Sequence, residues 1–221
     1  MISCTLRPVP EPVKRRYRSP RRAERAAATQ RAIHLAAREL FTTKGYAATA
    51  VADVASRAGV SVDTVYASVG RKPQLMQVVI DMALASSDRP ATADERDYVQ
   101  EVRAAPTAAA KLATYAAALG RIMPNVAPLF DALTQAALTD PECAALRASI
   151  AGRRAANMKV LAAELRATGD LRADLSDADV AHILWTTNAP EYYALVAGTW
   201  SDERYAELLT DLWTRLLLDR S

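Results

Sequence analysis

The chain has 221 residues, of which 51% are hydrophobic and 24% charged, and this composition favours helix throughout and allows one sizeable core or a small module joined to a larger one. No window approaches the roughly 18 apolar residues of a membrane span, and the first residues contain no apolar signal segment. Because two cysteines cannot form a disulfide framework, we expect a cytoplasmic protein that does not enter membranes.

Charge is distributed unevenly along the chain. Residues 1–72 contain 14 Lys and Arg against 5 Asp and Glu, a net charge of +9, whereas residues 73–221 contain 14 against 20, a net charge of −6. A basic segment on an acidic remainder indicates a polyanionic partner for the basic segment alone. A solvated charge run would give the same asymmetry, so charge alone does not decide.

Residues 1–18 are rich in proline and basic side chains and contain little that could be buried. We interpret them as a disordered basic arm that lies in the minor groove of DNA through Arg15, Arg16 and Arg18. Two alternatives remain: a tail that only raises solubility, or residues that belong to a misassigned start codon.

The first helix is predicted to begin with Ser19 as its N-cap and Pro20 at its first position. Lys44 in its last turn and Gly45 just beyond it are typical of a helix end. Its apolar residues recur at helical spacing and predict one buried stripe, formed by Ile33, Ala36, Ala37, Leu40 and Phe41.

Two short helices joined by a tight turn are predicted next, as in a helix-turn-helix. Thr49 is expected to cap the first, which ends at Gly59, and Ser61 to cap the second, whose inward residues are Val65 and Val69. A fourth helix should begin within residues 70–73 and end at a linker near residues 86–90. Its buried face is predicted to comprise Leu75, Met76, Val79, Ile80 and Ala83.

Only helices are predicted beyond the linker. They should cover about 107–123; 125–139, delimited by Pro124 and Pro128; a long segment from Asp140 to about Gly169; a segment capped by Ser176 or Asp177; and one capped by Ser201. The last helix has an apolar stripe that is too wide for a surface helix, which predicts cover by its own subunit and by a second one. A helix that only completes the internal core is the alternative. The stripe comprises Tyr205, Leu208, Leu209, Leu212, Trp213, Leu216 and Leu217.

The region at residues 41–76 resembles the TetR family of transcriptional regulators. The matching elements are Lys44-Gly45-Tyr46, Thr49, Val54-Ala55, Ala58-Gly59-Val60-Ser61, Thr64-Val65-Tyr66 and Lys72. The C-terminal part is similar to an actinobacterial-looking branch in short stretches such as ATGDLR at 167–172. The resemblance implies an all-α homodimer, with a three-helix DNA-binding head and a helical body that binds a ligand and dimerises. We therefore expect a basic arm at 1–18, a helix-turn-helix domain at 19–71 and a regulatory domain at 72–221.

The expected DNA contacts fall into two groups. Phosphate contacts are expected from the hydroxyls of Thr49, Ser61, Thr64 and Tyr66 and from the ammonium of Lys72 at a helix start. Base edges are expected to meet Val62, Asp63, Ala67 and Ser68. None of these four is Arg, Asn or Gln, so we predict weak specification by this helix and much of the affinity from the arm.

Two further sites are predicted in the body. A ligand pocket is expected to be lined by Tyr115, Met123, Phe130, Leu133, Arg154, Asn157 and Met158, although Arg154 and Asn157 would serve equally as a buried polar pair. A four-helix dimer interface is expected at Val180, Ile183, Trp185, Leu209, Leu212, Trp213 and Leu216. His34 and His182 lack ligand companions, so we expect no metal and no cofactor.

The sequence thus predicts a ligand-responsive repressor that acts as a homodimer on a pseudo-palindromic operator. No motif for nucleophilic, phosphate-binding or zinc chemistry occurs, so an enzyme is not expected. The alternatives are a nucleoid-type protein that binds DNA without sequence preference, or a helical interaction protein without operator specificity.

Overall fold

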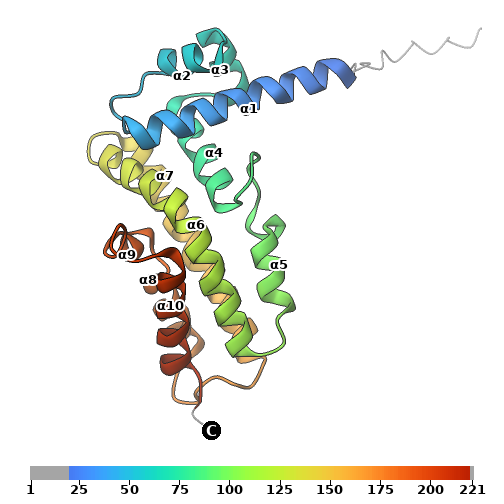
Figure 1. Ribbon diagram of the computed structural model, residues 1–221, viewed down its shortest axis with the longest axis vertical. Helices are drawn as coiled ribbons and strands as arrows, with labels where there is room; N and C mark the ends of the chain where they lie inside the picture. Colours follow the sequence, from blue (N-terminus) through green and yellow to red (C-terminus); the bar gives the residue numbers. More distant parts are fainter. Residues whose placement is uncertain (1–19, 220–221) are drawn as a thin grey trace, which may run out of the picture.

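The computed structural model describes residues 20–219, which form ten α-helices and one 3-10 turn arranged as a head above an elongated body (Figure 1). The head comprises α1 (Pro20–Thr43), α2 (Val51–Ala58) and α3 (Val62–Val69), and α4 (Lys72–Leu84) leads into the body. The body comprises η1 (Ala93–Glu95), α5 (Asp97–Ala104), α6 (Ala108–Ala137), α7 (Pro141–Arg166), α8 (Asp177–Thr187), α9 (Pro190–Ala194) and α10 (Asp202–Leu217). Ser19 and the arm residues Arg15, Arg16 and Arg18 lie outside the described residues.

Local chemistry sets the ends of the head helices. Gly59 directly follows α2 and Gly45 lies two residues after the end of α1; their φ values of +69° and +80° belong to a conformation that favours glycine. The Ser61 hydroxyl accepts a hydrogen bond from the backbone N–H of Thr64 at 3.1 Å and caps α3. The predicted stops at Gly45 and Gly59 and the predicted Ser61 cap are therefore confirmed. Phe41 and Val65 are buried in the small core of the head.

The predicted cap of α2 is wrong. The N-cap is Ala50, whose N–H donates to the Asp53 carboxylate at 2.9 Å. Thr49 is 1% exposed, and its hydroxyl donates to the Gly45 carbonyl at 2.8 Å. Asp53, at the third helical position, accepts from the N–H of the N-cap residue, and Thr49 lies one residue before the cap, where its hydroxyl fastens the α1–α2 loop.

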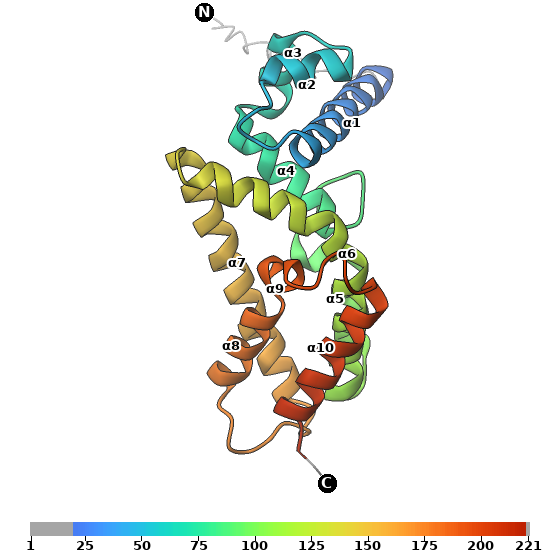
Figure 2. The ribbon, with the colours of Figure 1, turned by 60° about the vertical axis from the view of Figure 1, so that its left-hand side comes forward.

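The expected break at Pro124 and Pro128 does not occur, because both prolines lie inside the continuous helix α6. Each proline removes one backbone hydrogen bond, and Figure 2 shows that α6 is strongly bent. Met123, Val126 and Leu129 are fully buried around them. Burial of three such side chains stabilises the chain by about 1.5–3 kcal/mol each, which is enough to keep the two halves in one helix.

The linker region holds more structure than the sequence predicted. The turn η1 and the helix α5 stand between α4 and α6. Only Val102 of α5 is buried, so this helix has no apolar stripe from which it could be predicted. The predicted caps at Asp140, Ser176 and Ser201 are all confirmed.

The wide apolar stripe of α10 is divided between two environments. Tyr205, Leu209, Trp213 and Leu217 are fully buried within the single chain, whereas Leu216 is 40% exposed. The prediction of Leu209 and Trp213 as dimer contacts is therefore wrong, because both side chains complete the core of their own subunit. Val180 on α8 is also fully buried and is corrected for the same reason.

The contact between α6 and α10 depends on a glycine. A Cβ at Gly120 would lie 2.7 Å from the backbone oxygen of Asp202, closer than real side chains approach. We expect Gly120→Ala to force the helices apart and to lower the free energy of unfolding by about 1–3 kcal/mol. The control is Gly152→Ala on α7, where a Cβ meets nothing within 4 Å, and it should be neutral or stabilising by up to about 1 kcal/mol. Urea unfolding at one protein concentration measures both; coincident midpoints would contradict the prediction.

Among residues 20–219, no helix is both long and apolar enough to cross a bilayer. Within the same range, no group of three His, Cys, Asp or Glu side chains is placed to hold a metal ion.

Candidate DNA-binding surface and ligand cavity

The outer flank of α3 is free at the end of the molecule farthest from the C-terminus (Figure 1). Val62 is 37% exposed and Tyr66 is 49% exposed, whereas Val65 on the opposite flank is buried. Ser68 is half-buried, and its carbonyl accepts a hydrogen bond from the Gln30 side chain at 3.1 Å, which holds α3 on α1. The exposed flank consists of Val62, Asp63, Tyr66 and Ala67.

The hydroxyls expected at DNA phosphates have different surroundings. Ser61 and Thr64 have their hydroxyl oxygens 2.8 Å apart, so one donates to the other and the second proton is free to point outward. The Tyr66 hydroxyl is on the exposed flank. Thr49 is buried and bonded to a carbonyl, and it is therefore removed from the set of surface donors.

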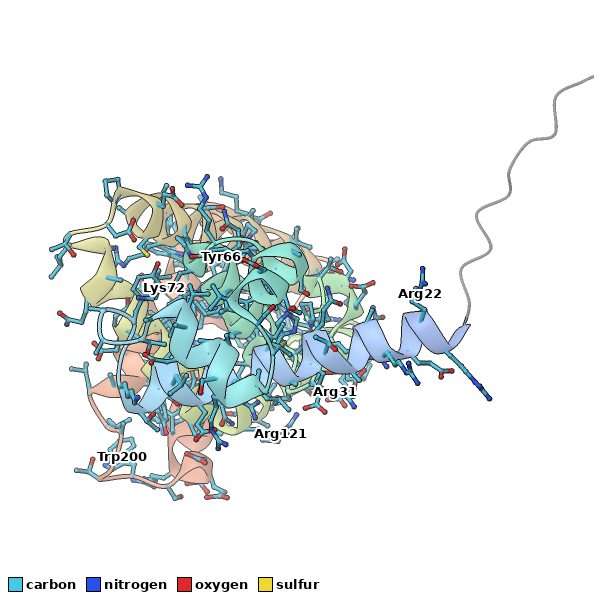
Figure 3. The ribbon with its side chains drawn as sticks, turned by 90° about the horizontal axis from the view of Figure 1, so that it is seen from above. Arg22, Arg31, Tyr66, Lys72, Arg121 and Trp200 are labelled. Atoms are coloured by element: carbon cyan, nitrogen blue, oxygen red, sulfur yellow. The ribbon has the colours of Figure 1, made fainter. Side chains whose placement is uncertain are left out.

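Lys72 lies at the first position of α4, on the face that is seen from above together with Tyr66 (Figure 3). Its ammonium is 4.0 Å from the centroid of the Tyr46 ring. Partial burial lowers the pKa of Lys72, and the nearby Asp140 and Asp53 carboxylates act in the opposite direction. The Lys72 side chain is thus held at the helix start and is only half-buried.

The head touches the N-terminus of α7 at two points. The Tyr46 hydroxyl donates to the Asp140 carboxylate at 3.5 Å, and burial raises the pKa of Tyr46, so it remains a donor. Arg71 forms a 2.6 Å ion pair with Glu142 that is largely exposed, and such pairs are worth only about 0–1 kcal/mol.

Helix α1 extends beyond the other head helices and carries exposed basic residues. Figure 3 shows Arg22 on the projecting end and Arg31 closer to the head. Arg31 lies 3.5 Å from the Asp88 carboxylate. Arg21, Arg22 and Arg25 are exposed and continue the basic character of the preceding arm.

The body contains a cavity of about 310 Å³ enclosed by η1, α5, α6, α7 and the segment joining α8 to α9. Six of the seven predicted pocket residues line it: Tyr115, Met123, Phe130, Arg154, Asn157 and Met158. Leu133 does not line it; it is fully buried in the core beyond Phe130, and its prediction is corrected. The sequence missed Tyr98 and Arg103 because α5 itself was not predicted.

Polar groups on one side of this cavity form a small network. Arg154 donates through Nη2 to the Asn188 side-chain oxygen at 2.5 Å, and the Asn188 amide donates to the Tyr115 hydroxyl at 2.8 Å. Burial lowers the pKa of Arg154 and raises the pKa of Tyr115. Arginine is so strong a base that it stays charged despite this burial.

Stacked aromatic rings lead from the cavity wall, at Tyr98 and Tyr115, into the core. The Tyr115 ring stacks between Tyr98, with centroids 6.2 Å apart, and Trp213, with centroids 5.6 Å apart. The Trp213 indole N–H donates to the Thr187 hydroxyl at 2.7 Å. Trp213 therefore connects the cavity wall to α8.

A partly apolar surface lies on α8 and α10, which face the viewer together in Figure 2. Trp185 is 37% exposed and Leu216 is 40% exposed, and Ile183 and Leu212 are partly exposed. These four are the residues of the predicted dimer set that the single chain leaves accessible.

The fold thus combines a helix-turn-helix head, whose α3 flank is exposed, with a helical body that contains a separate ligand-sized cavity. Residues 33–78 match the family model for bacterial regulatory proteins of the tetR family. The matched segment runs from α1 into α4 and includes the whole helix-turn-helix, so this part of the chain is similar to the DNA-binding domain of tetR-family regulators.

Solved structures support the same fold over most of the chain. A candidate TetR-family transcriptional regulator from Rhodococcus sp. is 16% identical with a TM-score of 0.67, over 86% of this chain and 99% of that one. NalD of Pseudomonas aeruginosa, the secondary repressor of the MexAB-OprM multidrug efflux pump, is 19% identical with a TM-score of 0.65, over 90% and 100%. A candidate regulator from Saccharomonospora viridis in complex with choline is 16% identical with a TM-score of 0.65, over 86% and 98%. No curated protein matches the chain.

Proposed function

We propose that the chain is a homodimeric repressor that binds a pseudo-palindromic operator and releases it when a small molecule occupies the body cavity. The observation that carries the proposal is the exposed flank of α3 on a head joined, in one chain, to a body with a separate cavity. The solved neighbour NalD is itself a repressor. A chromosomal operator as partner would place the protein in the cytoplasm. The proposed units are the arm at 1–18, the head at 19–71 and the body at 72–221.

On DNA, the exposed flank of α3 enters the major groove. Tyr66, Lys72, Ser61 and Thr64 bind phosphates, and Val62, Asp63, Ala67 and Ser68 meet base edges. Val62 and Ala67 suit thymine methyl groups, and Asp63 can accept from a cytosine amino group. The small number of polar base readers favours a modest contribution of α3 to specificity.

Helix α7 supplies a physical connection between cavity and head. Its N-terminal residues Asp140 and Glu142 hold Tyr46 and Arg71 of the head segment, and Arg154 of the same helix lines the cavity. A ligand that shifts α7 would therefore move the head, and in a dimer it would change the spacing of the two α3 helices.

Selection from random duplexes tests the proposed function. Rounds of binding and amplification should enrich an inverted repeat, with half-sites about one helical turn apart. The enriched site should bind at least about 10³-fold more tightly than a scrambled duplex at the same salt concentration. Equal binding of all duplexes would favour the nucleoid-type alternative, and absence of binding would favour an interaction protein.

The exposed apolar residues of α8 and α10 are proposed to form the dimer interface. We expect Leu216→Glu to convert the dimer to a monomer, because it places charges at the centre of an apolar contact. Light scattering after gel filtration measures the mass, and the same variant should lose operator affinity. Leu138→Glu is the control, since Leu138 is 77% exposed at the α6–α7 turn. A dimer that survives the Leu216 change would exclude this surface.

The basic arm remains a prediction with its own test. Deleting residues 1–18 removes the basic residues Arg7, Lys14, Arg15, Arg16 and Arg18. If the arm binds DNA, operator affinity should fall by about tenfold or more, and the slope of log affinity against log salt should become shallower by roughly 0.9 for each lost phosphate contact. An unchanged affinity and an unchanged slope would leave only the solubilising role.

A further inference from the structure

Resting on the proposed function, we propose that the effector of the body cavity is an anionic amphipathic molecule: a small carboxylate whose head group binds Arg154 and Tyr115 and whose apolar body fills the rest of the cavity.

The charge balance of the cavity wall leaves one arginine of the described residues without a counter-charge. Arg103 is paired with Asp94 at 2.6 Å and with Glu164 at 3.2 Å. Arg96 lies 3.8 Å from Asp81. Within residues 20–219, Arg154 is the cavity arginine that has no carboxylate within ion-pair distance. A positive charge beside apolar walls is costly unless a counter-charge is supplied, and an anionic ligand supplies it.

Arg154 and Tyr115 bring hydrogen-bond donors to the cavity wall. Only Nη2 of Arg154 bonds to protein, through Asn188 and the Trp185 carbonyl, so within the described chain Nε and Nη1 remain free to donate. The Tyr115 hydroxyl finds only the Met158 sulfur, 3.9 Å away, as an acceptor, and a thioether is a weak one. Both sites therefore have donors to offer to an oxygen acceptor.

A buried amide holds these two donor groups in place. Asn188 is 3% exposed; its oxygen binds Arg154 and its amide nitrogen donates to the Tyr115 hydroxyl. The guanidinium and the hydroxyl thus lie on the two sides of one side-chain amide. A carboxylate has two acceptor oxygens, so it can accept from both groups, and charge-assisted bonds of this kind are the strong ones.

The rest of the wall selects an apolar body and disfavours a cationic ligand. Val102, Leu119, Met123 and Val126 line the cavity beside the stacked Tyr98 ring. The cavity carboxylates Asp94 and Glu164 are already bound to Arg103, so no free anion remains in the described wall for an ammonium group. A volume of about 310 Å³ is at the small end of ligand sites.

Calorimetric titration with three matched probes tests the inference. Phenylbutyrate with its ring at the chain end, the corresponding amide and the corresponding primary amine share one apolar body and differ only in head group. At about pH 7 the acid is anionic and the amine cationic. We expect the acid to bind at least tenfold more tightly than the amide, and the amine to bind most weakly. The acid alone should also release the selected operator duplex.

Variants locate the effect at the proposed residues. Arg154→Met should abolish the tenfold preference for the acid while it changes the affinity of the amide by less than about threefold. Tyr115→Phe should weaken the acid by a smaller factor. The control is Lys159→Met, which removes one charge from an exposed position on the same helix and should leave the preference intact. A circular dichroism spectrum that matches the spectrum of the parent protein establishes that Arg154→Met is folded.

The outcomes separate this inference from the proposed function. Any one of four results would overturn the proposal of an anionic ligand, even if operator binding is intact. These results are equal binding of acid and amide, tighter binding of the amine, binding of none of the three probes, and a preference for the acid that survives in Arg154→Met. If the protein prefers the acid but binds no DNA duplex, the inference about the cavity is supported and the proposed function as a DNA-binding repressor is contradicted.

Discussion

Replacing Ala67 with Glu should reduce operator affinity by about 100-fold or more and leave the stability of the protein unchanged. Ala67 is exposed on α3, on the flank opposite the buried Val65. A carboxylate there would face the phosphates that line the major groove, and juxtaposed like charges cost several kcal/mol. A homodimer carries the change twice, and each 1.4 kcal/mol is about a factor of ten.

The matched control for this prediction is Ala109→Glu. Ala109 is exposed in the first turn of α6, at the end of the body far from the head (Figure 1). Both variants add one negative charge to a helix surface, so a global charge effect would weaken both equally. Fluorescence anisotropy of a labelled operator measures affinity, and thermal unfolding checks the fold. Full affinity of a folded Ala67→Glu protein would mean that α3 does not enter the groove.

Features that depend on a few neighbouring residues could be predicted from the sequence. Gly45 and Gly59 end helices because of their own backbone freedom, and Ser61 caps α3 with its own hydroxyl. The failure at Thr49 has the same local origin: Ala50 is the N-cap and its N–H donates to the Asp53 carboxylate, so α2 starts one position later than predicted. One position was enough to turn a surface hydroxyl into a buried one.

Features that depend on distant segments could not be predicted in the same way. The continuity of α6 across Pro124 and Pro128 is decided by burial against other helices, which local propensity does not contain. The stripe of α10 was recognised, but its division into a buried side at Trp213 and an exposed side at Leu216 requires knowing where α6 and α8 lie.

The ligand cavity illustrates both cases. Helical spacing placed Arg154, Asn157 and Met158 on a shared side of α7, and all three line the cavity. Their polar partner Asn188 comes from the end of another helix, 34 residues after Arg154, and only the fold brings the two together. The chemistry of the wall, and hence the ligand class, therefore emerged only with the structure.

Replacing Trp213 with Ala should lower the free energy of unfolding by about 3–5 kcal/mol, the usual cost of removing a fully buried tryptophan. Since domains are stable by only about 5–15 kcal/mol, this is a large fraction of the total. From α10, the Trp213 ring stacks on Tyr115 of α6, and its indole N–H donates to the Thr187 hydroxyl of α8. The variant therefore loses buried volume, a ring contact and a hydrogen bond together. Urea unfolding at fixed protein concentration measures the loss.

Two further variants divide that loss among its causes. Trp213→Phe keeps a ring against Tyr115 but leaves the Thr187 hydroxyl without its donor, and it should cost about 1–3 kcal/mol. Trp200→Ala removes an indole that is 39% exposed and should change stability by less than about 1 kcal/mol. If Trp213→Ala lowered the free energy of unfolding no more than Trp200→Ala, the described packing of α10 against Tyr115 would be contradicted. Tyr115 belongs to both the stack and the proposed anion site. Trp213→Phe keeps the Tyr115 hydroxyl that is proposed to bind the carboxylate, so it should weaken phenylbutyrate binding less than Tyr115→Phe does.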